Sequence, residues 1–200
     1  KDVSCAFEQG GFYAIIGESG SGKSTFLSLL AGLDVPSEGN IYVQGQPLDR
    51  MDRDAYRLNQ ASVVYQSFHL FPLLTALENV MLPMEFKKIR KKEASVRAEK
   101  LLKRVGLGER IFRQFPKMMS GGEQQRVAIA RAVAAGGEII LADEPTGNLD
   151  SDNEQKIVAL LKELAHEDGY TVIVITHNQG VAAQTDHVFR MSDGKLEQVR

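Results

Sequence analysis

The stretch GESGSGKST, residues 17–25, gives the strongest indication of the fold of this chain. It fits the pattern G-x-x-x-x-G-K-[ST], which is typical of loops that bind phosphate groups. An apolar run at residues 12–16 precedes it and predicts a strand, while residues 25–31 have helical spacing and stop at Gly32. The glycines allow a tight turn with inward-facing N–H groups, and the helix start adds the positive end of its dipole. Strand, turn and helix together predict an anion cradle.

Two side chains of this loop are expected to have particular tasks. Lys23 is expected to reach the β- and γ-phosphates of a nucleotide, and the Ser24 hydroxyl to bind Mg²⁺. The residues predicted to bind nucleotide here are Gly17, Glu18, Ser19, Gly20, Ser21, Gly22, Lys23, Ser24 and Thr25. The alternative is a surface loop rich in glycine and serine that fits the pattern by chance, which the flanking strand and helix disfavour.

The composition narrows the class of protein. The 200 residues are 43% hydrophobic and 25% charged, as in an ordinary globular protein. A net charge of -2 gives no overall attraction to nucleic acid, so we expect no nucleic-acid partner. The single Cys5 excludes a disulfide within the chain. No apolar run is long enough to span a bilayer.

A second group of polar residues follows the apolar run at residues 139–142. Such a run predicts a buried parallel strand, and ligands gather at the carboxyl ends of strands in open α/β sheets. Asp143 is therefore predicted to hold Mg²⁺, and Glu144 to align and deprotonate a water. The alternative, an ordinary Asp-Glu turn on the surface, is disfavoured directly after so apolar a strand.

Apolar periodicity predicts the order of elements along the rest of the chain. Strands are predicted at residues 41–43, 61–65, 138–142, 171–175 and 188–191, and helices at residues 93–106, 124–133 and 153–165. We expect residues 188–191 to close the sheet. This order predicts a mainly parallel sheet with a helical segment inserted in the middle of the chain.

The stretch MSGGEQQR at residues 119–126 resembles the signature L-S-G-G-Q-Q-Q-R of ATP-binding-cassette (ABC) ATPases. DEPTGNLD at residues 143–150 and His177 after the following strand agree with this resemblance, and every landmark stands in the family's order. The chain is thus identified as resembling an ABC transporter ATPase domain, and it looks most like the subgroup of lipoprotein-release and macrolide-export systems.

The resemblance implies an α/β fold, that of a P-loop NTPase with a mainly parallel RecA-like sheet, a small antiparallel β part and an inserted helical subdomain. Residues 1–200 would form a single ABC ATPase domain, with a nucleotide-binding core at 1–66 and 135–200 and the helical subdomain at 67–134. We expect a further strand to precede Lys1 in the native protein, because the family's adenine-stacking aromatic residue lies on such a strand. Phe12 and Tyr13 are instead expected in the core.

The signature implies a site shared by two copies. Ser120, Gly121 and Gly122 open a helix and would bind the γ-phosphate of a nucleotide held by the other copy. Asp150 would belong to the loop that links the two sites across the dimer.

Other roles implied by the resemblance concern the chemistry. Gln66 would touch Mg²⁺ and the attacking water, Glu144 would be the general base, and His177 would contact the γ-phosphate. Two residues depart from the signature. Met119 replaces leucine, a swap that conserves volume. Glu123 replaces glutamine and brings a carboxylate near a triphosphate unless the side chain points away.

The function implied is hydrolysis of ATP with bound Mg²⁺, coupled to export or extraction of a substrate. The expected partners are a second copy of the cassette, in an ATP-sandwich homodimer, and a transmembrane permease subunit that would hold the chain at the cytoplasmic face of the cell membrane. Residues 68–74, FHLFPLL, are expected either in the core of the helical part or in a groove for a short helix of that subunit.

Three other functions would use some of the same motifs. An ATP-gated regulatory module of a membrane complex would use the same site and transport nothing. A soluble ABC protein of DNA repair or translation would carry long coiled-coil insertions or two cassettes, and this sequence shows neither. A phosphate-loop kinase is disfavoured because the Ser-Gly-Gly stretch at residues 120–122 would have no task.

Overall fold

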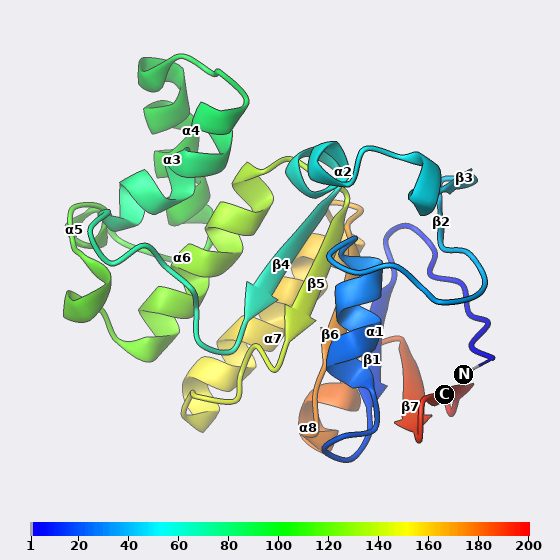
Figure 1. The fold of residues 1–200 in the computed structure, drawn as a ribbon. Coiled ribbons are helices and arrows are strands. Elements are labelled where there is room, and N and C mark those ends of the chain that lie inside the picture. Colours follow the sequence, from blue (N-terminus) through cyan, green and yellow to red (C-terminus); the bar gives the residue numbers. More distant parts are fainter. Residues whose placement is uncertain (1) are drawn as a thin grey trace. The chain divides into compact units, whose positions relative to one another are not determined.

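The computed structural model describes residues 2–200 and contains a six-stranded sheet with the strand order β4-β5-β6-β1-β7-β8 (Figure 1). The strands are β1 (Phe12–Ile16), β4 (Ala61–Tyr65), β5 (Ile139–Asp143), β6 (Thr171–Ile175), β7 (His187–Ser192) and β8 (Lys195–Gln198). β6 pairs in parallel with β1 and β5, and β1 pairs in parallel with β7. The mainly parallel α/β sheet predicted from the sequence is therefore confirmed.

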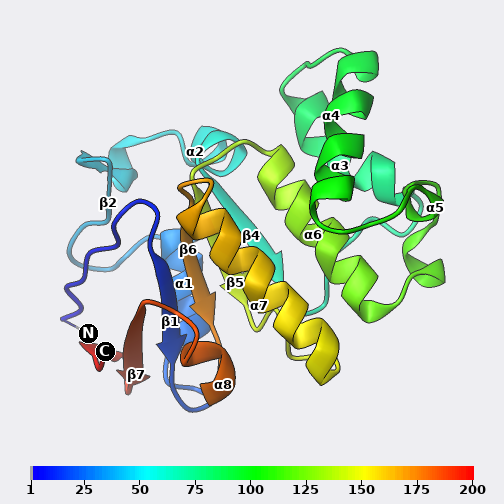
Figure 2. The same ribbon diagram turned by 180° about the vertical axis from the view of Figure 1, so that it is seen from behind.

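Both faces of the sheet are covered, which explains why its central strands are apolar throughout. Every residue of β1 and β6 is buried. Tyr13 and Ile15 pack with Leu27 of α1 (Lys23–Leu30) on one face. Ala14 and Ile16 pack on the other face, where α8 (Gln179–Ala182) lies (Figures 1 and 2). The prediction that Phe12 and Tyr13 belong to the core is confirmed by their exposed fractions of 0% and 3%.

Two pairs of antiparallel strands complete the strand pairing of unit 1. β8 pairs with β7 in antiparallel fashion, so the prediction that residues 188–191 close the sheet is wrong. The sequence KLEQ of β8 has one apolar residue, which is the pattern of an exposed edge strand and gives little hydrophobic signal. A separate two-stranded sheet joins β2 (Tyr42–Val43) to β3 (Gln46–Pro47) and is the predicted small antiparallel part.

The chain divides into two compact units. Unit 1 comprises the chain up to Val63, Gly137–Glu144 and Leu161–Arg200, and it also holds the 3₁₀ helix η1 (Leu48–Arg50) and α2 (Arg53–Asn59). Unit 2 comprises Val64–Gly136 and Pro145–Leu160. The boundaries predicted at residues 66/67 and 134/135 stay a prediction, and in the contact-based division residues 145–160 join the helices.

Unit 2 is built mainly from helices. They are α3 (Ala76–Phe86), α4 (Lys91–Arg104), α5 (Glu109–Phe112), η2 (Pro116–Met118), α6 (Gly121–Ala134) and the first part of α7 (Ser151–His166). α3 begins with a capping box in which the Thr75 hydroxyl accepts from the Glu78 N–H and the Glu78 carboxylate accepts from the Thr75 N–H. The buried Asn79 then bonds to the main chain of Phe71 and Leu74, which fixes the loop ahead of α3.

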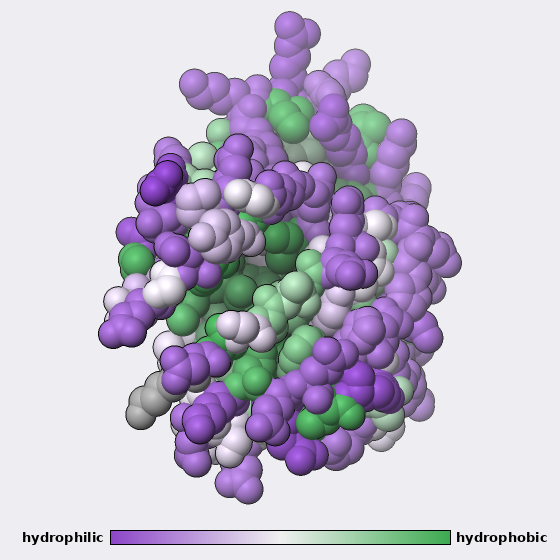
Figure 3. All heavy atoms as spheres, turned by 90° about the vertical axis from the view of Figure 1, so that its right-hand side faces the viewer, coloured by the Kyte–Doolittle hydropathy of each residue, from purple (hydrophilic) through white to green (hydrophobic). Residues whose placement is uncertain are grey.

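Large apolar side chains are exposed in both units. In unit 1 they are Leu33, Val35, Tyr42 and Val199. Figure 3 shows apolar atoms gathered in a hollow on the side of the molecule that it views. In unit 2 Leu73 is 86% exposed. No helix within residues 2–200 has the length and apolar character that crossing a membrane requires.

Candidate nucleotide-binding site

Several residues predicted to bind phosphate or to act in hydrolysis follow the carboxyl ends of three adjacent parallel strands of unit 1. β6 lies between β5 and β1, and Ile175 at its end is in register with both Asp143 of β5 and Ile15 of β1. The phosphate loop follows β1, Glu144 follows β5 and His177 follows β6. Because parallel strands present their carboxyl ends together, these segments lie at the edge where open α/β sheets bind ligands.

The phosphate loop has the backbone that an anion cradle needs. Gly20 and Gly22 have φ angles of 80° and 107°, a region that side chains with a Cβ rarely enter. Gly17 is required for space, because a Cβ there would lie 2.3 Å from the Met191 carbonyl oxygen. Glu18, Ser19 and Gly20 are exposed at the tip of the loop.

The start of α1 leaves its N–H groups available to a ligand. Gly22 is the N-cap and supplies no side-chain cap, and the first turn has no acidic residue. The Ser21 hydroxyl is buried without a hydrogen-bond partner among the described residues. An uncapped helix start beside an unpaired hydroxyl is a fit for phosphate oxygens.

The Lys23 side chain folds back onto the phosphate loop. Its Nζ donates to the carbonyl oxygens of Gly17 and Glu18 at 2.8 and 2.7 Å. The ammonium group is therefore held above the loop that it belongs to. Ser24 and Thr25 are exposed on the first turn of α1, beside it.

The two acidic residues at the end of β5 differ in environment. Burial, then the nearby Glu144 carboxylate, raises the pKa of Asp143, and the Lys23 ammonium opposes this shift. Glu144 has a φ angle of 46°, in the left-handed region, which costs a residue with a Cβ about 1–2 kcal/mol. Its N–H donates to the Ile175 carbonyl oxygen at 2.9 Å, so the sheet ladder holds this strained residue in place. Strain that the surrounding structure enforces is a feature of functional sites.

His177 and Glu144 form a hydrogen-bonded pair. The Glu144 Oε1 atom accepts from the His177 backbone N–H at 3.1 Å and lies 2.8 Å from His177 Nδ1. The Glu144 side chain is 18% exposed, whereas the His177 side chain is 73% exposed. The pair therefore turns one carboxylate oxygen toward the histidine, while no hydrogen bond within residues 2–200 engages Oε2.

In unit 2 the signature stretch forms the start of α6, where a second capping box lies. The Ser120 hydroxyl accepts from the Glu123 N–H at 3.3 Å, and the Glu123 carboxylate accepts from the Ser120 N–H at 2.8 Å. The spacing S-x-x-E is the sequence pattern of a capping box, so this motif could have been predicted from residues 120–123. Glu123 points back to the cap, and its Oε1 lies 3.5 Å from an Arg110 guanidinium nitrogen.

The signature glycines are also packing residues. A Cβ on Gly122 would lie 2.3 Å from the Asn153 amide oxygen, and a Cβ on Gly121 would lie 3.4 Å from Leu149. The start of α6 thus approaches the segment that leads into α7. This close approach has no signature in the sequence, because Asn153 and Gly122 come from different elements.

Asp150 and Gln66 are both hydrogen-bonded within unit 2. The Asp150 carboxylate accepts from the Asn153 backbone N–H and side-chain amide, both at 2.8 Å, which lowers the pKa of Asp150. The Gln66 side-chain amide donates to the Asn148 side-chain oxygen, and the Asn148 side-chain amide donates to the Gln66 backbone carbonyl oxygen. The sequence pattern alone indicates no role for Asn148 or Asn153.

Unit 1 offers a few oxygen ligands, which suit Mg²⁺ better than a metal ion that is bound by protein side chains only. Within residues 2–200 no group of three or more histidine, cysteine, aspartate or glutamate side chains could hold a metal ion. The Asp143 carboxylate and the Ser24 hydroxyl are oxygen ligands. Mg²⁺ is usually bound by one or two carboxylates together with waters and substrate phosphates.

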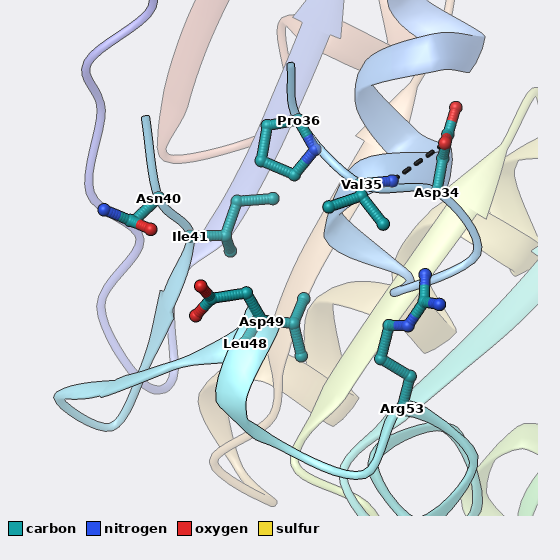
Figure 4. A pocket seen from close by; sticks show the side chains of 8 residues that line it. All are labelled: Asp34, Val35, Pro36, Asn40, Ile41, Leu48, Asp49 and Arg53. Atoms are coloured by element: carbon teal, nitrogen blue, oxygen red, sulfur yellow. Dashed lines mark hydrogen bonds between the residues drawn. The ribbon is translucent and has the colours of Figure 1, made fainter. Parts of the chain in front are cut away.

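A separate pocket of about 130 Å³ lies elsewhere in unit 1 (Figure 4). It is lined by Asp34, Val35, Pro36, Asn40, Ile41, Leu48, Asp49 and Arg53. The Asp34 carboxylate that faces it already accepts from the Val35 N–H at 2.8 Å. None of the residues predicted to bind nucleotide lines this pocket.

Fold and loop together define a P-loop nucleotide-binding domain. Comparison with known proteins then identifies its family, since the sequence profile described as ABC transporter matches residues 1–147. The chain is 46% identical over 199 residues to the macrolide export ATP-binding/permease protein MacB 1 of Yersinia pestis, covering 98% of this chain and 30% of that protein. It is 44% identical over 206 residues to the lipoprotein-releasing system ATP-binding protein LolD 2 of Rhodopirellula baltica, covering 98% and 80%.

Solved structures agree with the sequence relatives. The bacterial ABC transporter cassette MJ0796, solved as a dimer, superposes with a TM-score of 0.90 at 44% identity, covering all of this chain and 90% of that one. A dimeric post-hydrolysis state of the same cassette, bound to ADP and Pi, gives the same values. This chain belongs to the ABC transporter family. It is the ATP-binding and ATP-hydrolysing part of an ABC transporter, as the sequence predicted.

Proposed function

We propose that two copies of this chain hold ATP and Mg²⁺ between the phosphate loop of one copy and the Ser120 helix start of the other, and that hydrolysis separates them. The uncapped start of α1, with the Ser21 hydroxyl unpaired, is the observation that carries the first half of this site. The dimeric MJ0796 structures support the second half.

Magnesium would be held by the Ser24 hydroxyl and the Asp143 carboxylate of unit 1, and the Gln66 amide oxygen stays a predicted further ligand. When bound, it would neutralise charge on the phosphate oxygens and orient them. Burial and the Glu144 charge disfavour the ionised form of Asp143, so a cation beside Asp143 would relieve a cost that this structure carries. Lys23 would exchange its two carbonyl acceptors for phosphate oxygens, which form stronger charge-assisted bonds.

Glu144 would act as the general base and His177 as its positioning partner. The histidine holds Oε1 of the carboxylate, which leaves Oε2 to accept a proton from the attacking water. With its side chain 73% exposed, His177 is also accessible to a γ-phosphate. Asp150, on the turn into α7, would contact the partner copy.

We further propose that a transmembrane permease subunit uses the work of this dimer for export or extraction, and holds the chain at the cytoplasmic face of the cell membrane. MacB is an ATP-binding/permease protein, and LolD belongs to a lipoprotein-releasing system. Phe71 and Leu73 are exposed by 49% and 86% on a loop that Asn79 fixes, which supports a docking surface for an apolar helix. An ATP-gated complex that moves no substrate would use the same surfaces, and a transport assay with the co-purified subunit separates the two.

The variant Glu144→Gln tests the central proposal. Its amide can still accept from His177 but cannot take a proton, so steady-state hydrolysis should fall by about 100-fold or more. ATP should still bind, and light scattering should then show a dimer that the ATP-free protein does not form. Glu163→Gln, on the exposed side of α7, is the control and should change neither property.

Two results would contradict parts of this proposal. Full turnover in Glu144→Gln would remove Glu144 from the role of base. A variant that binds ATP without turnover and stays monomeric would remove the shared site, although the chain would remain an ATPase.

A further inference from the structure

The side chains of Gln66 and Asn148 form a reciprocal pair in unit 2. The Gln66 Nε2 atom donates to Asn148 Oδ1 at 3.2 Å, and the Asn148 Nδ2 atom donates to the Gln66 carbonyl oxygen at 3.1 Å. We call this arrangement the amide pair. Because one bond fixes the end of the Gln66 side chain and the other fixes its backbone, the pair restricts every rotatable bond between them.

Gly147 provides the room that the amide pair needs. A Cβ at this position would lie 2.6 Å from Gln66 Nε2 and 3.0 Å from Gln66 Cδ, closer than side chains tolerate. The φ angle of Gly147 is not positive, so its backbone does not itself demand glycine. Space for Gln66 is therefore the reason for a glycine here.

The turn that carries Gly147 and Asn148 is firmly anchored. The Leu149 N–H donates to the Thr146 carbonyl oxygen at 3.0 Å, which closes a four-residue turn with Gly147 and Asn148 in its middle. Thr146 is 4% exposed, so one end of the turn is fixed in the interior. The turn is followed directly by Asp150. The Asp150 carboxylate caps the start of α7 by accepting hydrogen bonds from the Asn153 backbone and side chain.

We propose that Gly147 and Asn148 are positioning residues that hold the Gln66 side chain ready for ATP hydrolysis and couple it to the segment that carries Asp150. The inference rests on the role of Gln66 given under the proposed function. A free glutamine side chain samples many rotamers, and a group that must find its geometry during the reaction acts more slowly than one already in place. Gln66 by itself is half-buried and has no other side-chain partner among residues 2–200.

The variant Gly147→Ala inserts a methyl group where the Gln66 amide lies. Because the displaced atoms are the end of a flexible side chain, the melting temperature should stay within about 2 °C of the parent. The kcat for ATP hydrolysis should fall by about three- to tenfold while the KM for ATP stays within about twofold, since only positioning is lost. Gly108→Ala is the matched control, because nothing lies within 4 Å of a Cβ at that exposed glycine.

Changes at Asn148 separate the two bonds. Asn148→Ala removes both and should lower kcat as Gly147→Ala does. Asn148→Asp keeps an acceptor for Gln66 Nε2 and loses the donor to the Gln66 carbonyl oxygen, so its kcat should lie between those of the parent and Asn148→Ala. This partial rescue would not follow from a purely structural role.

Two further measurements test the amide pair directly. Combining Gly147→Ala with Gln66→Ala should lower kcat no more than Gln66→Ala alone, because the methyl group then displaces nothing. In NMR spectra of the ATP-free protein, the side-chain amide resonances of Gln66, assigned by their loss in Gln66→Ala, should shift in Gly147→Ala and Asn148→Ala and remain in place in Gly108→Ala.

The outcomes are decisive in both directions. Lower kcat in both single variants, non-additivity with Gln66→Ala and shifted amide resonances would support the inference. Unchanged kcat, additive effects or unmoved resonances would overturn it, and so would a Gln66→Ala variant with full turnover. In each of those cases the parent still hydrolyses ATP, so the proposed shared site would be untouched, whereas a monomeric Glu144→Gln variant would argue against that site alone.

Discussion

The two helix starts expected to bind phosphate are built in different ways. α1 begins at Gly22 with no side-chain cap and no acidic residue in its first turn. α6 begins at Ser120 with a complete capping box that includes the Glu123 carboxylate. One start leaves its N–H groups to a ligand, whereas the other already satisfies two of its groups and carries a negative charge.

The glycines of the two regions differ as well. Gly20 has a φ angle of 80° and nothing within 4 Å of a Cβ, so its backbone conformation is what requires glycine. Gly122 requires space, because a Cβ would overlap the Asn153 amide. In the phosphate loop of unit 1 the backbone conformation requires glycine. In the signature stretch of unit 2 the close packing of neighbouring side chains requires it.

The capping box orders the start of α6 without a bound nucleotide. The Ser120 oxygen accepts from the Glu123 N–H, which leaves the hydroxyl hydrogen free to be donated outward. The Ser120 N–H is used by Glu123. Phosphate would therefore meet the Ser120 hydroxyl and the N–H groups of Gly121 and Gly122, beside a carboxylate that weakens the attraction.

The largest effect is expected at the phosphate loop. Lys23→Ala removes a cation that would bond to two phosphates, so ATP affinity measured by calorimetry should fall by about 100-fold. Lys162→Ala, on the exposed side of α7, is the control. Equal affinity in the Lys23 variant and the parent would show that the loop is not the cradle.

A smaller effect on stability is expected at the signature glycine. Gly122→Ala should lower the free energy of unfolding in urea by about 1–3 kcal/mol, because it forces the Asn153 side chain aside. Adding Asn153→Ala should restore part of that loss. Gly20→Ala should cost about 1 kcal/mol through its backbone alone, with no partner able to relieve it. If Asn153→Ala restored none of the free energy of unfolding lost in Gly122→Ala, crowding of Asn153 would not be the cause of that loss.

The charge of Glu123 should have a modest effect on dimer formation. Glu123→Gln keeps an acceptor for the Ser120 N–H and removes the charge, so in the Glu144→Gln background the ATP-bound dimer should tighten by about two- to fivefold per site. The gain should shrink in 0.5 M salt, where exposed charges are screened. Glu85→Gln, at the exposed end of α3, is the control.

Arg110 sharpens the same test. Arg110→Gln removes the cation near Glu123 and should loosen the dimer slightly, but only while Glu123 is present. An equal effect of Arg110→Gln with and without Glu123 would mean that Arg110 acts on something else. A Glu123→Gln dimer no tighter than its parent would mean that the capping carboxylate lies out of reach of the phosphate.

The smallest effect concerns the capped start of α7. Hydrogen bonds from the Asn153 backbone and side chain lower the pKa of Asp150 below the ordinary value of an aspartate. A depressed pKa contributes stability above that value, which is lost as the pH falls through the folded-state pKa. The difference in melting temperature between the parent and Asp150→Asn should therefore be present at pH 7 and shrink below about pH 4. A difference independent of pH would exclude the ionised cap.

Some features of the fold could be predicted from local patterns. The strand, glycine turn and helix around the phosphate loop could be predicted because they are contiguous in the chain, and the place of Asp143 at the end of a strand because the residues before it are apolar. β8 was missed because an edge strand needs little hydrophobicity. The capping box at Ser120 could have been found, because its spacing is written in the sequence.

The class of protein, the order of its elements and the phosphate loop can be read from the amino-acid sequence, because they depend on neighbouring residues and on regular apolar spacing. The contacts of His177 with Glu144 and of Asn148 with Gln66, and the space that Gly122 leaves for Asn153, become visible only in the folded chain. Each of these contacts joins segments between 31 and 82 residues apart. These contacts depend on the register of the sheet and on the packing of unit 2. Neither can be predicted from a local sequence pattern.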